Sequence, residues 1–496
     1  LNANGKLDRR ALPEPDASRP ELEGAYVAPR TEAERVLAEI WRETLRVERV
    51  GVHDNFFELG GDSILSIQVI ARARKAGVQV TPRQVFQHQT VAALAAVAGT
   101  AAAVVGEQGA VRGRVELTPI QRRFFAQELA DLHHFNQSLL LELRRPLDPA
   151  LLAEAVRALL AHHDALRLRF RRTPDGWEAE SAGAEEAVPF GRVDLSRLDD
   201  EERWGELAAE AGRAQGGLDL ERGPLLRAVL FHPNHGQADR LLLAVHHLAV
   251  DGVSWRILVE DLETACGQLS RGEPVELGPK TTSFQRWAER LRAHAQTDAA
   301  RGELEHWAAV GRGAAPLPVD HPEGENTEAS ARVVLVALDE EETRALLAEV
   351  PQAYRTQIND VLLAALVEAF HGWTGERRLL VDLEGHGRED LFEDVDLSRT
   401  VGWFTSIYPV ELERVEGGPG ELLRAVKERL RAVPGKGIGH GVLRWLSEDP
   451  DVRARLAEAR APEVVFNYLG HFDPAGGGDG GFARGGQGGG REGRGR

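Results

Sequence analysis

The chain has 496 residues, enough for two to four domains, and its 42% hydrophobic and 28% charged residues are typical of a globular protein. The formal net charge of −18 and the lack of a long apolar run argue against nucleic acid and membranes as partners. Cys266 is the only cysteine and no Cys/His cluster has metal-ligand spacing, so we expect a cytoplasmic protein without a disulfide or a metal.

Residues 1–30 are rich in proline, aspartate and arginine, and we interpret them as a linker. The sequence contains no methionine, even at position 1. We therefore expect the chain to be a piece of a longer multidomain enzyme.

The segment 31–99 predicts a small helical bundle. Thr31 and Glu34 have the spacing of a capping box, and apolar residues follow at helical intervals through Leu45. An amphipathic stretch begins at Ser63, and two shorter helical stretches lie at RQVFQ and TVAALAAVAG. We expect four helices, with the long loop VGVHDNFFELGGDS between the first two.

Residues 100–113 form a second linker, rich in alanine and glycine, and the pattern changes at residue 114. From 114 to 472, short apolar strands alternate with helical stretches, which predicts an α/β domain. Its length allows two lobes, at approximately 114–310 and 311–472. Residues 473–496 are half glycine, so we expect a disordered tail there.

The first candidate site is the sequence LGGDSI, which places Ser63 after a Gly-Gly-Asp turn at the predicted start of a helix. Glycines let the loop turn tightly and leave the serine uncrowded. The N–H groups and the dipole of a helix N-terminus favour a phosphodiester on that serine, and Asp62 can cap the helix. The simpler interpretation is an ordinary N-cap after a glycine turn.

The flanking residues favour a functional serine, because DNFFELGGDSILSIQVIARAR resembles the phosphopantetheine attachment segment of peptidyl carrier proteins in nonribosomal peptide synthetases. This resemblance covers roughly residues 31–99. It implies 4'-phosphopantetheine carried covalently on Ser63 and attached by a phosphopantetheinyl transferase. Upstream, NGKLDRRALP resembles the last motif of an adenylation domain, so residues 1–30 are expected to be the C-terminal remnant of such a domain and a linker.

The second candidate site is HHLAVDG, which contains His246, His247, Asp251 and Gly252 where an apolar strand gives way to a helix. A histidine at a strand end can project into a cleft, and its pKa near neutrality suits a general base. Asp251 can pair with an arginine and fix the loop. The alternative for the histidine pair is a buried, hydrogen-bonded position at the strand end.

The full pattern resembles the signature of the condensation-domain superfamily, which includes peptide-bond-forming condensation domains and epimerization domains. The resemblance implies that His247 is catalytic, with His246, Asp251 and Gly252 in supporting roles. It also implies two chloramphenicol-acetyltransferase-like lobes that form a V around a tunnel. The expected fold is therefore multidomain, a small all-α four-helix carrier bundle followed by a two-lobed α/β domain.

Several segments resemble epimerization domains in particular. They are LTPIQRRFF (117–125), HHFNQS (133–138), KTTSFQRWA (280–288), AYRTQINDVLLAAL (353–366), LEGHGRED (383–390), DLSRTVGWFTSIYPV (396–410) and VVFNYLG (464–470). The sequence departs from that pattern at His440, where the family usually shows tyrosine, and at His471, where it usually shows glutamine. The family also continues with further strands and a helix beyond residue 472, so we expect a shortened second lobe.

Glu384, in EGHGRE, is the residue that distinguishes epimerization from condensation. Inversion of an α-carbon removes a proton from one face and returns one to the other, which two groups on opposite sides do best. A thioester makes the α-proton more acidic than an amide does. We expect His247 and Glu384 to take these two roles, with the enclosed carboxyl group able to act as an acid. Outside this motif, Glu384 would be interpreted as a surface carboxylate in a glycine-rich turn.

The oxygen that becomes negatively charged during proton removal needs a hydrogen-bond donor. Asn467 and Tyr468 in FNYLG, or backbone amides near Ser254, are candidates. Tyr468 can instead act as an acid in the proton relay, and both residues can simply be buried at a strand end. Arg388 can orient Glu384 or bind the phosphate of the arm.

Together, these features predict a carrier–epimerization didomain that interconverts the L and D forms of an aminoacyl or peptidyl thioester. The expected partners are an upstream adenylation domain in the same chain and the condensation domain of the next module. Two alternatives remain open, a condensation domain that forms a peptide bond with the same histidine and a non-catalytic docking domain.

Overall fold

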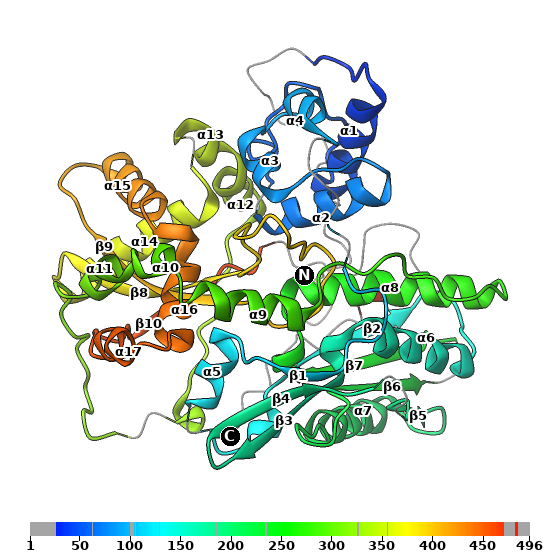
Figure 1. Cartoon of the computed structure of the whole chain (residues 1–496). Helices are drawn as coiled ribbons and strands as arrows, with labels where there is room; N and C mark the ends of the chain where they lie inside the picture. The colour runs from blue at the N-terminus through cyan, green and yellow to red at the C-terminus, as the bar shows by residue number, and fades with distance from the viewer. Residues whose placement is uncertain are drawn as a thin grey trace. The chain divides into compact units, whose positions relative to one another are not determined.

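The computed structural model describes residues 26–61, 63–99, 104, 106–127, 129–183, 187–233, 236–324, 327–354, 356–470 and 482–484. The chain divides into two units, which are coloured along the sequence in Figure 1. The first contains residues 1–103 and Leu338–Val361, and the second contains Val104–Ala337 and 362–496. Within the described ranges, no helix is both long and apolar enough to span a membrane.

The carrier region is all-α, as its sequence predicts. Its helices are α1 (Glu32–Leu45), α2 (Ser63–Lys75), α3 (Pro82–Gln87) and α4 (Val91–Val97). The predicted capping box is present, because the Glu34 amide donates to Thr31 Oγ1 (3.2 Å) and the Thr31 amide donates to Glu34 Oε2 (2.8 Å). Fully buried residues, among them Trp41 and Phe56, form the core between the helices.

The first unit also includes a later segment that contains α12 (Glu340–Arg344), a π-helical turn (Ala345–Glu349), α13 (Val350–Tyr354) and the start of α14 (Ile358–Thr374). From the sequence, this segment was expected to belong to the second lobe. The preceding residues Val333–Val336 form no strand and are 82–91% exposed. No sheet pairing at those four residues ties the segment to the second unit.

The first lobe is built on a five-stranded sheet with the order β11-β2-β7-β6-β5. Its strands are β2 (Asn136–Leu143), β5 (Phe190–Asp194), β6 (Leu226–His232), β7 (Arg240–His246) and β11 (Phe482–Arg484). Figure 1 shows α6 (Pro149–His162) and α8 (Gly252–Ser270) on one face of the sheet and α7 (Asp200–Gly216) on the other. Strand β7 is buried along nearly its whole length, so its C-terminal end is a rigid position.

A smaller sheet and two helices complete the described part of this lobe. The sheet has the order β1-β4-β3, with β1 (Gly113–Val115), β3 (Leu168–Thr173) and β4 (Gly176–Ser181). The helices are α5 (Pro119–Phe125) and α9 (Phe284–His294), and short 3₁₀ turns lie at Leu132–His134, Asp164–Arg167 and His247–Ala249.

The second lobe has a three-stranded sheet with the order β10-β8-β9, formed by β8 (Arg378–Gly385), β9 (Ser406–Glu413) and β10 (Val464–Phe466). Its helices are α10 (Asp298–Arg301), α11 (Leu304–Ala309), α15 (Pro419–Arg431), α16 (Ile438–Leu446) and α17 (Pro450–Ala457), with 3₁₀ turns at Glu328–Ser330 and Pro434–Gly437. The expected succession of a helical carrier and a two-lobed α/β domain is therefore confirmed.

The interpretation of residues 473–496 as a disordered tail is wrong for 482–484. These residues form β11, which pairs antiparallel with β2 and places Phe482 opposite Leu143. The Phe482 side chain is fully buried, so the pairing is accompanied by burial of a large apolar side chain. The remaining residues of that segment lie outside the described ranges.

Candidate active site

The loop before Ser63 is held tightly against the core of the carrier bundle. Gly60 has φ +91°, a conformation that favours glycine, and a Cβ on Gly61 would lie 2.5 Å from the ring of Phe56. Phe56 in turn packs edge-on against Trp41, with ring centroids 5.0 Å apart. The glycines thus allow the chain to turn directly into α2, whose first residue is Ser63.

This geometry fits a covalently attached phosphopantetheine. Ser63 stands at the N-terminus of a 13-residue helix, where the backbone N–H groups and the helix dipole favour an anionic phosphodiester. Asp62, the expected helix cap, lies outside the described residues.

His247 lies immediately after β7, and its ring is fixed at both nitrogens. Val250 O is 2.9 Å from Nδ1, and a carbonyl can only accept, so Nδ1 carries the proton. The other nitrogen, Nε2, is 3.0 Å from Gln137 Nε2, which donates to it. Gln137 is itself oriented by Trp255, whose indole N–H donates to Gln137 Oε1 (2.8 Å). The neutral ring therefore carries its lone pair on Nε2, the form that a general base requires, and Gln137 must give way before Nε2 can accept a proton from a substrate.

Aromatic rings flank His247 and orient it further. The Phe135 ring is stacked on it with centroids 5.3 Å apart, and the Trp403 ring lies 4.3 Å away. Neither Gln137 nor Trp403 was singled out from the sequence, although both lie in segments quoted above, HHFNQS and DLSRTVGWFTSIYPV. Their contacts with His247 depend on tertiary packing, which the local pattern does not show.

His246 has a structural position and cannot share the role of base. Its Nε2 donates to Leu132 O (2.8 Å), and its Nδ1 accepts from the Leu248 amide (3.2 Å). Burial lowers the pKa of His246 to about 3, so the ring remains neutral near pH 7. For His246, the buried and hydrogen-bonded alternative is the one that the structure contains.

Asp251 and Arg388 join the HHLAVDG and EGHGRE motifs through a buried ion pair. Arg388 Nη2 lies 3.1 Å and 3.3 Å from the two carboxylate oxygens of Asp251. Asp251 also accepts from the Ser254 amide (2.7 Å) at the start of α8 and from the Phe404 amide (3.2 Å). The Ser254 amide is thus committed to Asp251 and is not free to stabilise a substrate oxygen.

Arg388 was expected to orient Glu384 or to bind the phosphate of the arm, but in this structure its guanidinium is part of the buried network around Asp251. Its side chain is 1% exposed, and Nη1 donates to Leu397 O and Thr400 O, both at 2.7 Å. A guanidinium that is enclosed in this way cannot bind a phosphate at the surface. Gly252 begins α8 beside Asp251 and is exposed, and a Cβ added there would meet no other atom within 4 Å, so packing does not require glycine at this position.

Glu384 lies near the end of β8, in the sheet of the second lobe. Asn467 Nδ2 donates to Glu384 Oε2 at 2.5 Å, so Asn467 positions the carboxylate in this structure. Tyr468 follows as a half-buried residue just after β10. Asp382 is two residues before Glu384 on the same face of the strand, and Arg123 from α5 pairs with it at 3.1 Å. Glu384 therefore projects from the sheet face on which the α5 side chain lies.

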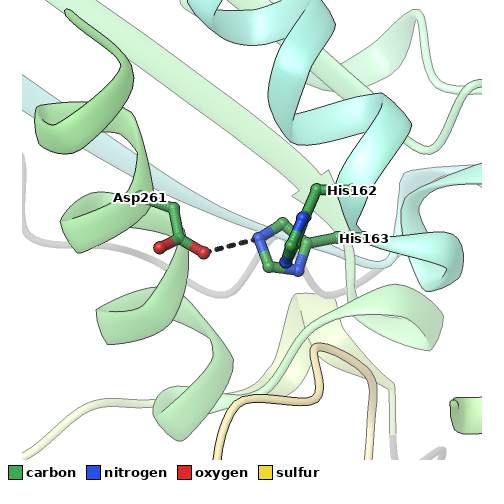
Figure 2. Close-up of side chains that lie close together, drawn as sticks. All are labelled: His162, His163 and Asp261. Atoms are coloured by element: carbon green, nitrogen blue, oxygen red, sulfur yellow. Dashed lines mark hydrogen bonds and ion pairs between the residues drawn. The ribbon is translucent and has the colours of Figure 1, made fainter. Parts of the chain in front are cut away.

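A buried cluster that carries no signal in the local sequence links α6 and α8 (Figure 2). His163 Nε2 lies 2.9 Å from Asp261 Oδ2, and possible ligand atoms of His162, His163 and Asp261 lie within 4.8 Å of one another. The second oxygen of Asp261 is ion-paired with Arg399. Both carboxylate oxygens are thus engaged, and a cation would have to displace the guanidinium. We interpret the cluster as a structural connection between α6, α8 and the chain at Arg399.

Two histidines in the downstream domain, the fully buried His246 and the half-buried His440, predict sensitivity to acid. Burial lowers the pKa of His246 to about 3 and that of His440 to about 4, below the ordinary value of 6.5. In the unfolded chain both bind a proton below about pH 6.5, so stability is lost as the pH falls from there toward the folded pKa values. Near pH 5, each of these two histidines is expected to lower the free energy of unfolding by about 1.4 kcal/mol for every unit by which the pH falls.

Urea unfolding at several pH values, followed by tryptophan emission, measures this slope. His440→Tyr, which introduces the residue that the resembling family usually has, is expected to reduce the slope by about 1.4 kcal/mol per pH unit. Equal slopes for the parent chain and the variant would show that His440 is not buried as a neutral group.

Comparison with known proteins matches the two regions expected from the sequence, and it assigns Leu338–Val361 to the downstream one. A model described as "Phosphopantetheine attachment site" matches residues 35–98, and a model described as "Condensation domain" matches residues 111–477. Linear gramicidin synthase subunits C and B of Brevibacillus parabrevis are 53% identical over 487 residues and 50% identical over 479 residues, each covering 96% of this chain. The chain spans 6% and 9% of the length of these relatives.

Solved structures agree with these matches. The epimerization domain from the third module of tyrocidine synthetase B has a TM-score of 0.72 and 36% identity, over 78% of this chain and 86% of that one. The first condensation domain of the CDA synthetase has a TM-score of 0.51 and 22% identity, over 66% of this chain and 75% of that one. The second likeness concerns the fold alone.

Proposed function

Because this chain belongs to the condensation-domain family of nonribosomal peptide synthetases and carries a phosphopantetheine attachment domain ahead of that domain, we propose that it is a carrier–epimerization didomain. Its substrate is an aminoacyl or peptidyl thioester on Ser63, and its reaction interconverts the L and D configurations at the α-carbon. The observation that carries the proposal is Glu384 near the end of β8, where Asn467 donates to its carboxylate, because the His247 tautomer would suit a condensation domain equally well.

His247 and Glu384 divide the proton transfer between them. His247 Nε2 takes the α-proton, and the electron pair of the broken C–H bond moves into the thioester carbonyl. A protonated Glu384 returns a proton to the opposite face, so that a new C–H bond forms with inverted configuration. One turnover leaves His247 protonated and Glu384 ionised, and the reverse reaction or exchange with water restores the starting state.

The other residues of the site hold these two groups in position. When bound, the phosphopantetheine arm supplies the thioester that acidifies the α-proton. Gln137 and the Val250 carbonyl fix His247, and Asn467 fixes Glu384. The Asp251–Arg388 ion pair fixes the loop that follows β8 against the start of α8. Tyr468 is the remaining candidate for a proton-relay acid or a donor to the substrate oxygen.

The proposal implies several partners. A phosphopantetheinyl transferase is needed to attach the arm, and an adenylation domain upstream in the same polypeptide would supply the aminoacyl group. The condensation domain of the next module would then accept the D-configured product. The likeness to an epimerization domain of tyrocidine synthetase B supports the epimerization assignment from which these partners follow.

Heavy water provides the test. The arm on Ser63 is loaded with an L-aminoacyl group, the chain is incubated in D₂O, and the released amino acid is analysed for α-deuterium and for its D:L ratio. We expect deuterium uptake together with a mixture of D and L forms. Normal loading without deuterium uptake would contradict the proposal, and a dipeptide formed with an added acceptor would instead identify a condensation domain.

Ser63→Ala provides the matched test of the attachment site. We expect this variant to fold, because the position begins a helix and alanine is a good helix former. It should show no mass increase when it is incubated with a phosphopantetheinyl transferase and coenzyme A. Ser66→Ala, one turn later on the same helix, is the control and should be loaded like the parent chain. Loading of Ser63→Ala would place the arm elsewhere.

A further inference from the structure

A largely apolar pocket lies beside the proposed catalytic residues and has no role in the proton transfer itself. It is lined by α5, α9, α16 and residues 403–407. Its apolar wall includes Ile120, Trp287, Leu291, Trp403, Ile407 and Ile438. Local sequence patterns give no indication of this pocket, because its walls come from four separate parts of the chain.

Two residues in the wall of the pocket are neighbours of the proposed catalytic residues, which do not themselves line it. The ring of Trp403, in its wall, contacts the ring of His247 with centroids 4.3 Å apart. On the other side, Ile407 in β9 lies directly opposite Glu384 in β8, so the two side chains share one face of the sheet. The wall of this pocket thus adjoins His247 through Trp403 and Glu384 through Ile407.

The chemistry of inversion requires such a space. When one group removes the α-proton and a second group returns it on the opposite face, the other three substituents of the α-carbon move only through a small angle. The amino acid side chain therefore occupies nearly the same position in the L and D forms. One pocket next to the two proton-transfer groups can hold it in both.

We propose that this pocket binds the side chain of the amino acid being inverted, and that the substrate class is amino acids with large aliphatic or aromatic side chains. The inference rests on the proposed function. The charged group in the lining supports this choice, because Arg123 is already paired with Asp382. A charged substrate side chain would lose its hydration without gaining a free partner in Arg123.

Two residues at the boundary of the pocket set its size. Ile407 is half-buried on a strand, where a larger aromatic residue is compatible with the backbone. Trp445, in α16, is also half-buried, and truncation there enlarges the pocket. Ile407→Trp should therefore exclude large side chains, whereas Trp445→Ala should admit larger ones.

The experiment compares two substrates on the same chain. The parent chain and Ile407→Trp are loaded on Ser63 with L-phenylalanyl or L-alanyl groups, and α-deuterium uptake in D₂O is measured for each. We expect Ile407→Trp to lower the ratio of phenylalanyl to alanyl exchange at least about tenfold, and Trp445→Ala to leave it equal or higher. The control is Val465→Trp, on β10 of the same sheet, where the side chain is 56% exposed and outside the pocket. A parallel loss for both substrates, or no change in the ratio, would overturn the inference.

Calorimetric binding separates this inference from the proposed function. Phenylalanyl and alanyl pantetheine amides, which lack the reactive thioester, are titrated into the Ser63→Ala chain with Ile or Trp at position 407. Tighter binding of the phenylalanyl amide than of the alanyl amide, lost in the chain with Ile407→Trp, would support the proposal that the pocket binds the side chain. This result would hold even if no chain exchanges α-protons. Exchange in the parent chain combined with equal binding of both amides would leave the proposed function standing and overturn the pocket.

Discussion

The variant His247→Ala is expected to accept the phosphopantetheine arm normally, but its rate of α-deuterium uptake is expected to fall at least about 100-fold. The reason is that His247 Nε2 is the nitrogen left free of a proton by the Nδ1–H···O=C bond to Val250. Alanine removes this base, while Gln137 keeps its hydrogen bond with Trp255. The measurement is mass spectrometry of the amino acid released after incubation in D₂O.

Glu384→Gln is expected to produce a loss of similar size in the D:L interconversion. Glutamine keeps the shape of the side chain and an oxygen that accepts from Asn467, but it cannot deliver a proton. Glu413→Gln, at the exposed end of β9 in the same sheet, is the matched control and should behave like the parent chain. The double variant His247→Ala/Glu384→Gln should interconvert D and L forms little more slowly than either single variant, because His247 and Glu384 act as a unit. Inversion at the parent rate in either single variant would show that the assigned residue has no part in proton transfer.

The second large effect is on stability, and it concerns the buried ion pair. Arg388→Met is expected to lower the free energy of unfolding by about 3–5 kcal/mol, because it leaves the Asp251 carboxylate buried without its countercharge. The side chains of Arg388 and Asp251 are 1% and 8% exposed, so water cannot replace the lost partner. Urea unfolding followed by tryptophan emission measures the change.

A double-mutant cycle and a surface control make this prediction specific. Asp251→Asn/Arg388→Met should be less destabilised than the sum of its two single variants, because neither charge remains unpaired. Arg377→Met removes a half-exposed arginine whose partner Glu416 is 87% exposed, and should cost less than about 1 kcal/mol. Additive single effects, or an equally large effect at Arg377, would mean that the Asp251–Arg388 pair is not the connection described above.

Features that depend on near neighbours in the sequence were predictable here. The capping box at Thr31 needs three residues of context, and the four carrier helices follow from apolar periodicity. That Asp251 can pair with an arginine and fix the loop was also expected from the sequence. Its partner, Arg388, was known only as a candidate for other roles, since 137 positions separate the two residues.

Features that depend on tertiary packing were not predictable. Gln137, on the neighbouring strand β2, contacts His247 Nε2, and Trp403 contacts the same ring from the second half of the chain. The strand at 482–484 was missed because its glycine-rich surroundings predict disorder, while its stability comes from pairing with β2. Local composition cannot reveal a partner that is hundreds of residues away.

The position of β11 has a consequence for how this protein is made. Strand β11 closes the edge of the sheet on which β7 positions His247, yet it follows the entire second lobe in the sequence. Synthesis proceeds from the N-terminus at roughly 5–20 residues per second, so the edge of β2 is uncovered for tens of seconds in the nascent chain. An uncovered strand edge pairs readily with other strands. The first lobe therefore emerges from the ribosome in a state that needs protection, and its sheet is completed after the sequence of the second lobe has emerged.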